Sequence, residues 1–447
     1  MMKYEYMNSD IEWIGEIPKH WKIDRLKDIS EINYAVLGSD TPNDFILKYI
    51  DISNVDVTGI VSETAIEELE FELAPSRARR IIKKGDVIIS SVRPNLQAIA
   101  FINLEDENLI CSTGFNVVKI SDNVISSKFL YYYLLSDYSK NYFEAAAKGV
   151  GYPAVADKDF NILKVLVPRL DEQIAIAKYL DKACADIDRV VEIKRKQIEN
   201  LQQQLKAQMS NWFAIGTDNN LKKTDSVIIP EIPEHWQLLK LKRVLEEKLK
   251  YGANESGDLD NPDDPRYIRI TDFDDDGSLR DDTFKSLPLE VANDYLLNEG
   301  DILFARSGAT VGKTFIFKNY EGVACYAGYL IKAVTLKYKM LPEYLYYYTK
   351  TKMYEDWKNL IFTQATIQNI GADKYQYLPV PVPPIEEQRE ILKKTDLLNE
   401  NVKKAQSKIE KQIEVLLTYK KSLIHEVVTG KKQVYSLTQE KKQMQTA

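Results

Sequence analysis

The sequence contains two copies of one repeat unit, and corresponding residues of the two copies are 215 positions apart. The opening of the unit, Ile17, Pro18, His20 and Trp21, returns as Ile232, Pro233, His235 and Trp236, and 232 − 17 = 215. The same step carries Gly85-Asp86 onto Gly300-Asp301, Tyr131-Tyr132-Tyr133 onto Tyr346-Tyr347-Tyr348, Val167-Pro168 onto Val382-Pro383 and Glu172-Gln173 onto Glu387-Gln388. Solenoids and propellers have periods of only about 20 to 50 residues. The longer step predicts two copies with separate cores, related by approximate two-fold symmetry.

The composition is that of a soluble globular protein. The 447 residues are 44% hydrophobic, which suffices for two cores of ordinary domain size. The sequence contains no apolar run long enough for a membrane span, and residues 1–6 lack the apolar stretch of a signal peptide, so we expect a cytoplasmic protein without membrane contact. Cys111, Cys184 and Cys325 lack CxxC spacing and are expected to be core thiols rather than disulfide or zinc ligands.

The net charge of −7 argues against a strongly basic nucleic-acid-binding protein. Affinity for a duplex depends on Lys and Arg side chains that displace counterions from phosphate. Residues 10–168 and 225–383 both carry an excess of Asp and Glu, which leaves the rest of the chain basic. A polyanion would therefore have to meet local basic patches, or a partner would have to supply cations.

Each copy is predicted to be a mixed α/β region followed by a long polar helix. Short apolar or β-branched runs bounded by Gly, Pro or Asp predict strands over Lys48–Ser53, Asp86–Ser90 and Ala98–Ile102, and over Tyr267–Thr271, Asp301–Phe304 and Thr314–Phe317. The predicted organisation is a globular domain over 1–169, a long helix over 170–215, a second globular domain over 216–384, a second long helix over 385–430 and a polar tail over 431–447. The tail has no apolar period and is expected to be disordered.

Both long helices are predicted to carry a coiled-coil seam. Each follows a proline-containing segment and has acids in its first turn. Apolar side chains recur at alternating steps of three and four; they are Ala177, Leu180, Cys184, Ile187, Val191, Ile198, Leu201, Leu205 and Trp212, and Thr395, Leu398, Val402, Ala405, Ile409, Ile413, Leu416, Leu423 and Val427. At 1.5 Å per residue such helices are roughly 60 Å long, which favours an antiparallel spacer pair over two separate surface helices.

The glycine-rich segment 308–314 resembles a phosphate-binding loop but departs from it. The GxxxxGK[ST] spacing requires glycine where Ser307 stands, and the segment lies between two predicted strands rather than at the start of a helix. A hairpin turn that offers donors to a polyanion is the better interpretation. His20 and His235 occupy equivalent places beside tryptophans and are expected to be structural. The tyrosine triplets are expected in helices, where core packing is favoured over base stacking.

Candidate nucleic-acid contacts cluster in matching loops of both copies. Arg, Lys, Asn and Gln can bridge two atoms on a base edge, and Ser, Thr and Tyr can contact phosphates. The candidates are Arg93, Asn95, Gln97, Lys148 and Tyr152 in the first copy, and Arg269, Arg306, Ser307, Thr310, Lys313, Gln364, Thr366, Gln368 and Asn369 in the second.

Taken together, these features resemble the specificity subunit of Type I restriction-modification enzymes. The residues that carry the resemblance are the IPxHW openings, Tyr267–Asp272, Ala305–Lys313 and the Val-Pro to Glu-Gln junctions before the long helices, and it covers nearly the whole chain. It implies two target-recognition domains, each reading one half of a split double-stranded DNA sequence, separated by two antiparallel helices. Because residues 148–152 match 362–366 poorly, the two halves are expected to read different bases.

The resemblance also implies that the chain is not catalytic and binds no cofactor or metal. Its implied partners are two modification subunits, which bring S-adenosylmethionine and methylate adenine, and restriction subunits, which use ATP and Mg²⁺ to translocate and cleave. Two other interpretations stay open: a structural adaptor whose duplicated domains bind protein, and a nucleotide hydrolase built on residues 308–314. If the chain is a specificity subunit, helix length should fix the gap between two short half-sites.

Overall fold

The computed structural model describes residues 4–55, 59, 61, 66–92, 98–120, 124–149, 153–216, 220–274, 277, 279–308, 310–363 and 369–434. The chain divides into two compact units. Unit 1 comprises Met1–Lys194 with Glu410–Ala447, and unit 2 comprises Arg195–Ile409. Each unit therefore combines one globular region with a part of each of two long helices.

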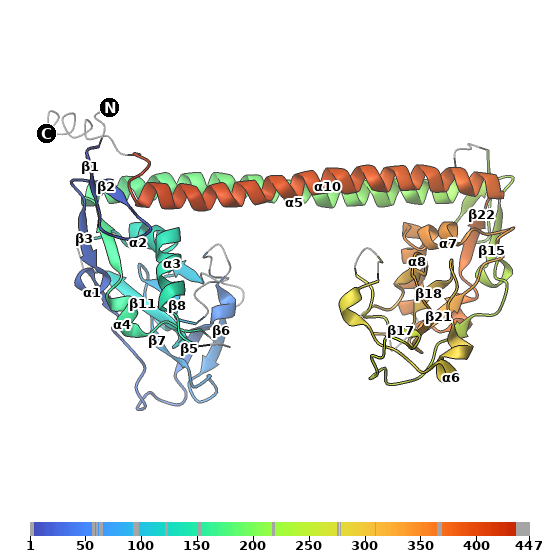
Figure 1. The fold of residues 1–447 in the computed structure, drawn as a ribbon, viewed down its shortest axis with the longest axis horizontal. Coiled ribbons are helices and arrows are strands. Elements are labelled where there is room, and N and C mark those ends of the chain that lie inside the picture. The colour runs from blue at the N-terminus through green and yellow to red at the C-terminus, as the bar shows by residue number, and fades with distance from the viewer. Residues whose placement is uncertain are drawn as a thin grey trace. The chain divides into compact units, whose positions relative to one another are not determined.

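Unit 1 is built from short strands and helices around two four-stranded sheets (Figure 1). The sheets are β4 (Ser30–Ile32), β11 (Phe115–Ile120), β8 (Val87–Ser90) and β9 (Ile99–Phe101), and β6 (Glu67–Glu70), β5 (Ile46–Ile50), β10 (Leu109–Ser112) and β7 (Ala78–Ile81). Two further pairs are β1 (Tyr6–Asn8) with β2 (Glu16–Pro18) and β3 (Lys22–Arg25) with β12 (Lys164–Val167). The helices are α1 (Leu26–Ile29), α2 (Ser127–Leu134), α3 (Asp137–Ala146) and α4 (Asp157–Asn161), with a 3-10 turn at Ile52–Asn54.

Unit 2 repeats most of this plan. Its four-stranded sheet is β16 (Lys250–Tyr251), β21 (Leu330–Ala333), β18 (Ile302–Ala305) and β19 (Thr314–Ile316). The pairs are β13 (Leu221–Lys223) with β14 (Glu231–Pro233), β15 (Gln237–Lys240) with β22 (Pro379–Val382), and β17 (Arg266–Ile268) with β20 (Ala324–Tyr326). The helices are α6 (Leu289–Ala292), α7 (Pro342–Tyr348), α8 (Lys352–Thr363) and α9 (Ala372–Tyr375), with 3-10 turns at Leu241–Arg243, Asp281–Thr283 and Asn293–Tyr295.

The two units share one sheet topology. The order β4-β11-β8-β9 in unit 1 corresponds to β16-β21-β18-β19 in unit 2, and both sheets are antiparallel. A parallel pair accompanies each sheet, β5 with β10 and β17 with β20. The prediction of a tandem repeat of mixed α/β units is confirmed.

Two predicted strands end three residues earlier in the structure, because an aspartate side chain competes for the backbone. Strand β5 stops at Ile50, and the carboxylate of Asp51 accepts the N–H of Ile52 at 2.6 Å to cap a 3-10 turn. Strand β17 stops at Ile268, and Asp272 accepts the N–H of Arg269 at 2.8 Å. Such local side-chain bonds favour turns over ladder pairing.

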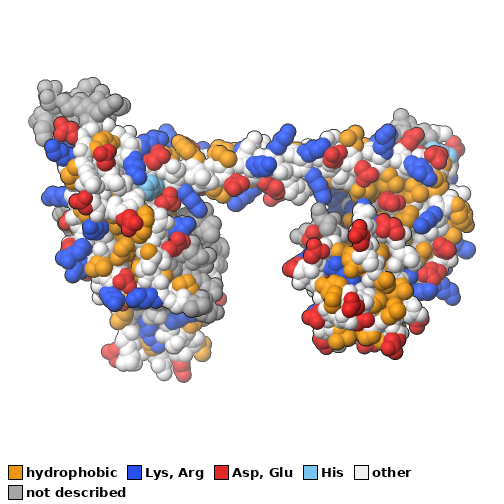
Figure 2. All heavy atoms as spheres, in the orientation of Figure 1, with side chains coloured by type: hydrophobic (Ala, Val, Ile, Leu, Met, Phe, Trp, Pro, Cys, Tyr) orange, Lys and Arg blue, Asp and Glu red, His pale blue; other side chains and the backbone are white. Residues whose placement is uncertain are grey.

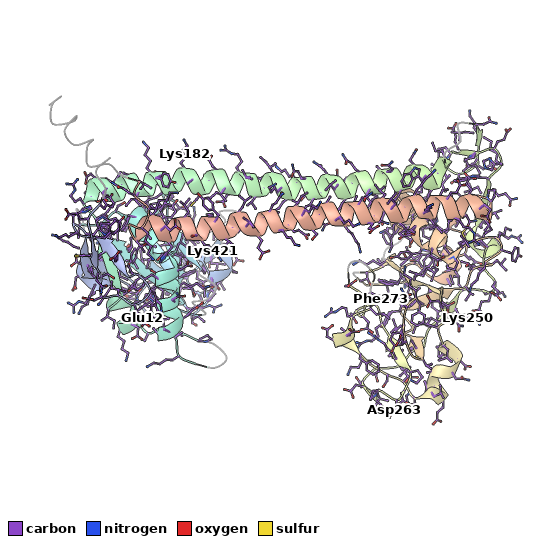
Figure 3. The ribbon with its side chains drawn as sticks, turned by 45° about the horizontal axis from the view of Figure 1, so that its top comes forward. Glu12, Lys182, Lys250, Asp263, Phe273 and Lys421 are labelled. Atoms are coloured by element: carbon purple, nitrogen blue, oxygen red, sulfur yellow. The ribbon has the colours of Figure 1, made fainter. Side chains whose placement is uncertain are left out.

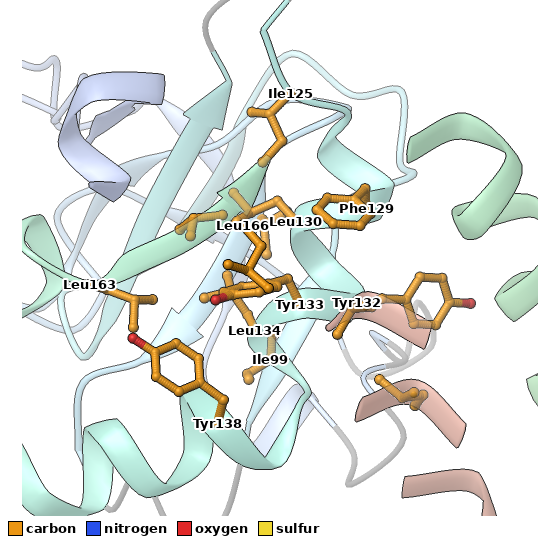
Figure 4. Close-up of a cluster of buried hydrophobic side chains, with 14 of the residues drawn as sticks. Ile99, Ile125, Phe129, Leu130, Tyr132, Tyr133, Leu134, Tyr138, Leu163 and Leu166 are labelled. Carbon is orange, nitrogen blue, oxygen red and sulfur yellow. The ribbon is translucent and has the colours of Figure 1, made fainter. Parts of the chain in front are cut away.

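The tyrosine triplets lie in helices α2 and α7, as predicted, and two rings of each triplet are held by hydrogen bonds. Tyr133 is fully buried in the core of unit 1 (Figure 4), and its hydroxyl donates to the carbonyl oxygen of Lys164 at 3.0 Å. The neighbouring Tyr132 donates to Asp181 of the following long helix at 2.8 Å. Unit 2 repeats the second bond between Tyr347 and Asp396 at 2.7 Å. Tyr132 and Tyr347 thus tie the globular regions to the long helices, while Tyr133 packs inside the globular region, so the rings have a packing role.

The long helices are α5 (Leu170–Ile215) and α10 (Ile385–Val428), and they pair antiparallel. In unit 1, Lys420 Nζ lies 2.7 Å from Asp188 Oδ2, and Lys194 Nζ donates to Gln412 at 2.7 Å, so the residue number rises on one helix as it falls on the other. All five predicted seam residues from Ala177 to Val191 are buried. By contrast, Lys182 and Lys421 point away from the pair (Figure 3). The seam prediction needs one correction at the end of α5, where Phe213 rather than Trp212 is fully buried and packs on Tyr344, 4.6 Å between ring centroids.

A Glu-Gln pair anchors the start of each long helix. The buried amide of Gln173 donates to the carbonyl oxygens of Pro168 (2.7 Å) and Val124 (3.1 Å) and accepts the N–H of Ser126 at 2.7 Å. Gln388 repeats this pattern 215 residues later. The preceding glutamate holds the histidine of the IPxHW opening: His20 lies 3.0 Å from Glu172, and the second copy has the same contact at 2.8 Å. Both histidines are thus structural, as predicted.

Candidate nucleic-acid interface

The structure brings five of the candidate residues of unit 2 into one surface feature. Strand β18 ends at Ala305, and the chain turns back into β19 at Thr314. Ser307 forms an antiparallel bridge with Asn369, and the N–H of Ile370 donates to the carbonyl oxygen of Arg306 at 2.9 Å. We call residues 306–308 and 310–313 together with Asn369 the hairpin site.

Two glycines allow the backbone conformation of the turn in the hairpin site, and two tyrosines hydrogen-bond to its carbonyl oxygens. Gly308 and Gly312 have φ of +78° and +80°, a conformation that side chains with a Cβ rarely adopt. Tyr354 donates its hydroxyl to the carbonyl oxygen of Gly312 at 2.8 Å, and Tyr375 donates to that of Ala305 at 3.0 Å. The turn leads into a strand rather than a helix, so it lacks the helix N-terminus that a phosphate-binding loop requires. The nucleotide-hydrolase interpretation has no geometric support here.

Three polar atoms of the hairpin site lack hydrogen-bond partners among the described residues. Arg306 Nε, Thr310 Oγ1 and Asn369 Oδ1 are each shielded from solvent, and no residue in the described part of the chain hydrogen-bonds to them. The guanidinium carbon of Arg306 lies 4.9 Å from the ring centroid of Tyr251, whose hydroxyl accepts the N–H of Ala372 at 2.9 Å. The arginine is therefore oriented by an aromatic ring while part of its donor capacity is unused. A donor, a hydroxyl and an acceptor in one feature can address a hydrogen-bonding ligand.

Arg269 is engaged elsewhere. Its guanidinium donates to Asp272 at 2.8 Å and to the carbonyl oxygen of Thr283 at 3.0 Å. These bonds close the loop after β17, and Asp272 is fully buried. The structure thus gives this candidate a role in holding the loop, which the sequence could not reveal.

The remaining candidates are described only in part. Lys148 of unit 1 is exposed and pairs with Ala154 through backbone bonds of 2.9 and 3.0 Å. Arg93, Asn95, Gln97 and Tyr152 of unit 1 lie outside the described residues, as do Gln364, Thr366 and Gln368 of unit 2.

The visible surface carries both signs of charge in each unit. Figure 2 shows Lys and Arg side chains interspersed with Asp and Glu over the units and along α5 and α10. Within the described residues, no cluster of three His, Cys, Asp or Glu side chains could hold a metal ion. The three cysteines are free and buried, as predicted, and burial raises the pKa of Cys184 to about 11. In the same part of the chain, no helix is both long and apolar enough to cross a membrane.

Comparison with known families decides the assignment. The family model described as Type I restriction modification DNA specificity domain matches residues 18–203 and again residues 233–415, once in each copy of the repeat. The chain belongs to this family. Two matches in tandem cover most of the sequence, and they confirm the family that the motifs indicate.

Curated relatives and a solved structure agree. The chain is 27% identical over 451 residues to the putative type I restriction enzyme MjaX specificity subunit of Methanocaldococcus jannaschii, covering 96% of this chain and 97% of that protein. It is 26% identical over 339 residues to the MjaVIII specificity subunit of the same organism, covering 73% and 75%. A solved chain from work on complex assembly and conformational transition of the type I R-M system shares the fold, with a TM-score of 0.70 at 22% identity, over 93% of this chain and 99% of that one.

Family membership assigns sequence-specific DNA recognition to the chain and leaves catalysis to other subunits. The structural-adaptor interpretation is not favoured, because the matched family is defined by DNA specificity. The hairpin site gathers five of the residues that the sequence predicts as DNA contacts. Sequence reasoning named its residues but missed Lys350 and Lys358, which the fold brings to the same turn.

Proposed function

We propose that the chain reads a bipartite duplex DNA target and that the hairpin site of unit 2 contacts one half-site. The observation that carries this proposal is the set of unpartnered atoms on Arg306, Thr310 and Asn369. A buried polar atom without a partner costs roughly 1–3 kcal/mol, so a ligand that supplies the partner recovers that free energy on binding. Such a site is complementary to a base edge.

The residue types favour a purine edge in the major groove. Asn pairs with N6 and N7 of adenine, and Arg pairs with O6 and N7 of guanine, each through two hydrogen bonds. Asn369 has a free acceptor and Arg306 a free donor. Ser307, Thr310 and Lys313 lie on the same turn, where they would contact the phosphate backbone beside that base.

For the other half-site we propose the corresponding loops of unit 1. These carry Arg93, Asn95, Gln97, Lys148 and Tyr152. The recognition domains would span 1–169 and 216–384, with spacer helices over 170–215 and 385–430 and a polar tail over 431–447. Because the two loop sets differ in residue type, each domain would read different bases.

We further propose that the chain acts in the cytoplasm with two modification subunits and with restriction subunits. The modification subunits would bring S-adenosylmethionine for adenine methylation, and the restriction subunits would use ATP and Mg²⁺. The net charge of −7 supports a need for partners, since additional cations would strengthen the hold on DNA phosphates.

Mapping methylated adenines in cells with and without this chain tests the proposal. The expected result is a two-part motif with an unread gap that appears only when the chain and its modification partner are both expressed. Tight partner binding with no chain-dependent methylation, and no salt-dependent affinity for duplex, would instead support the adaptor.

A further inference from the structure

Three lysines gather at the turn of the hairpin site. Lys313 is exposed on the turn itself. Lys350, from the junction of α7 and α8, donates from Nζ to the carbonyl oxygen of Thr314 at 2.7 Å, where the turn ends. The stem of Lys358, from α8, lies against the turn so closely that a Cβ at Gly312 would clash with it. Lysine side chains from three separate parts of unit 2 therefore lie at one turn.

The carboxylate of Glu355 acts on both Lys350 and Lys358. Lys358 pairs with Glu355, 2.8 Å between Nζ and Oε2, and its side chain is only 17% exposed. Burial lowers the pKa of Lys350 to about 8, and the positive charges of Lys313 and Lys358 add to this effect against the opposing influence of Glu355. The ring centroid of Tyr346 lies 4.5 Å from Lys350 Nζ and supplies weak compensation. Among the described residues, the two cationic side chains of Lys350 and Lys358 therefore share the single carboxylate of Glu355.

Unit 1 has no such cluster at the corresponding positions. Subtracting the step of 215 from 313, 350 and 358 gives 98, 135 and 143, which are Ala98, Leu135 and Phe143. Ala98 and Phe143 line a small hollow there, together with Leu134 and Lys140. The elements correspond, since β9 and α3 of unit 1 occupy the places of β19 and α8. The lysines are therefore an addition to the common fold rather than part of its core.

We propose that Lys313, Lys350 and Lys358 form a phosphate-binding subsite at the hairpin turn of unit 2, where the corresponding positions of unit 1 hold no lysine. The subsite rests on the proposed DNA recognition. It adds that the two units contribute unequally to phosphate binding. Phosphate contacts fix a protein on the duplex without reading sequence. Unit 2 therefore contributes more of the electrostatic, sequence-independent affinity than unit 1.

The salt dependence of binding tests the subsite directly. We would measure the affinity of the full chain, in complex with its modification partner, for a mixed-sequence duplex by fluorescence anisotropy at several salt concentrations. Each lost phosphate contact lowers the slope of log K against log salt by about 0.9. The triple variant K313Q/K350Q/K358Q is expected to lose about 2 to 3 from the slope, and the three single variants less than 1 each. K318Q, at the opposite end of β19, is the matched control and should leave the slope unchanged.

The possible outcomes distinguish failure of the phosphate subsite from failure of the proposed function. A slope in the folded triple variant equal to that of the wild type would overturn the subsite. Should the triple variant unfold, the single variants decide by the same slope, and K350R and K358R should restore it. Methylation mapping judges the proposed function independently, because loss of phosphate contacts leaves the recognised bases unchanged. A wild-type chain that directs no methylation would sink the proposed function whatever the slope.

Discussion

The side-chain amide of Gln173 donates a hydrogen bond of 2.7 Å to the carbonyl oxygen of Pro168, the last residue but one before helix α5. Gln388 makes the same bond to Pro383 at 2.9 Å, just before α10. Proline cannot donate an N–H to a neighbouring strand, so the chain can leave the sheet at this point. The glutamine then fixes the direction in which the helix departs from the globular region. The spacer role that we propose for the helices requires such a fixed departure.

Gln173→Ala is expected to destabilise unit 1 by roughly 2–4 kcal/mol, because two carbonyl groups and one N–H would lose their buried partner. Thermal or denaturant unfolding of the full chain measures the loss. Gln202→Ala is the matched control, since Gln202 is exposed on the same helix and makes only a 3.5 Å contact with Gln406. Equal stability of the two variants would show that the buried amide does not anchor the helix.

Arg306→Ala is expected to weaken binding to a mapped target through one half-site by about 1–3 kcal/mol, a factor of roughly 5 to 150. The arginine is held over Tyr251 with an unused donor, so its loss removes base contacts rather than stability. Arg306→Lys should not restore affinity, because a lysine cannot make the paired hydrogen bonds of a guanidinium. Anisotropy with duplexes altered in one half-site at a time assigns the effect. Unchanged affinity for every duplex would remove Arg306 from the interface.

Much of the fold could be predicted because each pattern in the first copy of the repeat has an independent match in the second copy. The strands that became β8 and β18, and the tyrosine helices α2 and α7, were each supported by a second copy at the same step. Strand ends were harder to predict, since they depend on which backbone N–H a side chain captures. Asp272 ends β17 in this way, and the spacing of apolar residues does not predict this strand end.

The candidate site was only partly predictable, because proximity in the fold is not proximity in sequence. Arg306, Thr310 and Lys313 were found from one loop, but Lys350 and Lys358 reach the same turn from another element. A signal did exist in the sequence. These lysines replace Leu135 and Phe143 of the first copy, and a charge that replaces an apolar residue of a repeated core points to a function of one copy alone.

Deleting four residues from each long helix is expected to shorten the unread gap of the target. Residues 199–202 and 406–409 are suitable, because Gln202 lies against Gln406 in the pair. The deletion removes about 6 Å at 1.5 Å per residue, which corresponds to roughly two base pairs of duplex at 3.4 Å each. Methylation mapping should return both half-sites with a smaller gap. An unaltered gap in a folded, active complex would show that the helices do not set the spacing.

DNA affinity is expected to fall as pH rises through about 8, and Lys350→Gln should remove most of this dependence. Burial and the nearby cations lower the pKa of Lys350 to about 8 in the free protein. A bound phosphate favours the charged form, so the same group has a higher pKa in the complex, and binding takes up a proton between the two values. Binding therefore loses free energy above pH 8, until Lys350 is neutral in both states. Glu355, Lys313 and Lys358 are the charges that act on this ammonium group. Anisotropy titrations between about pH 7 and 9, at constant salt, give the comparison. Parallel pH profiles for the wild type and Lys350→Gln would mean that no phosphate reaches this lysine.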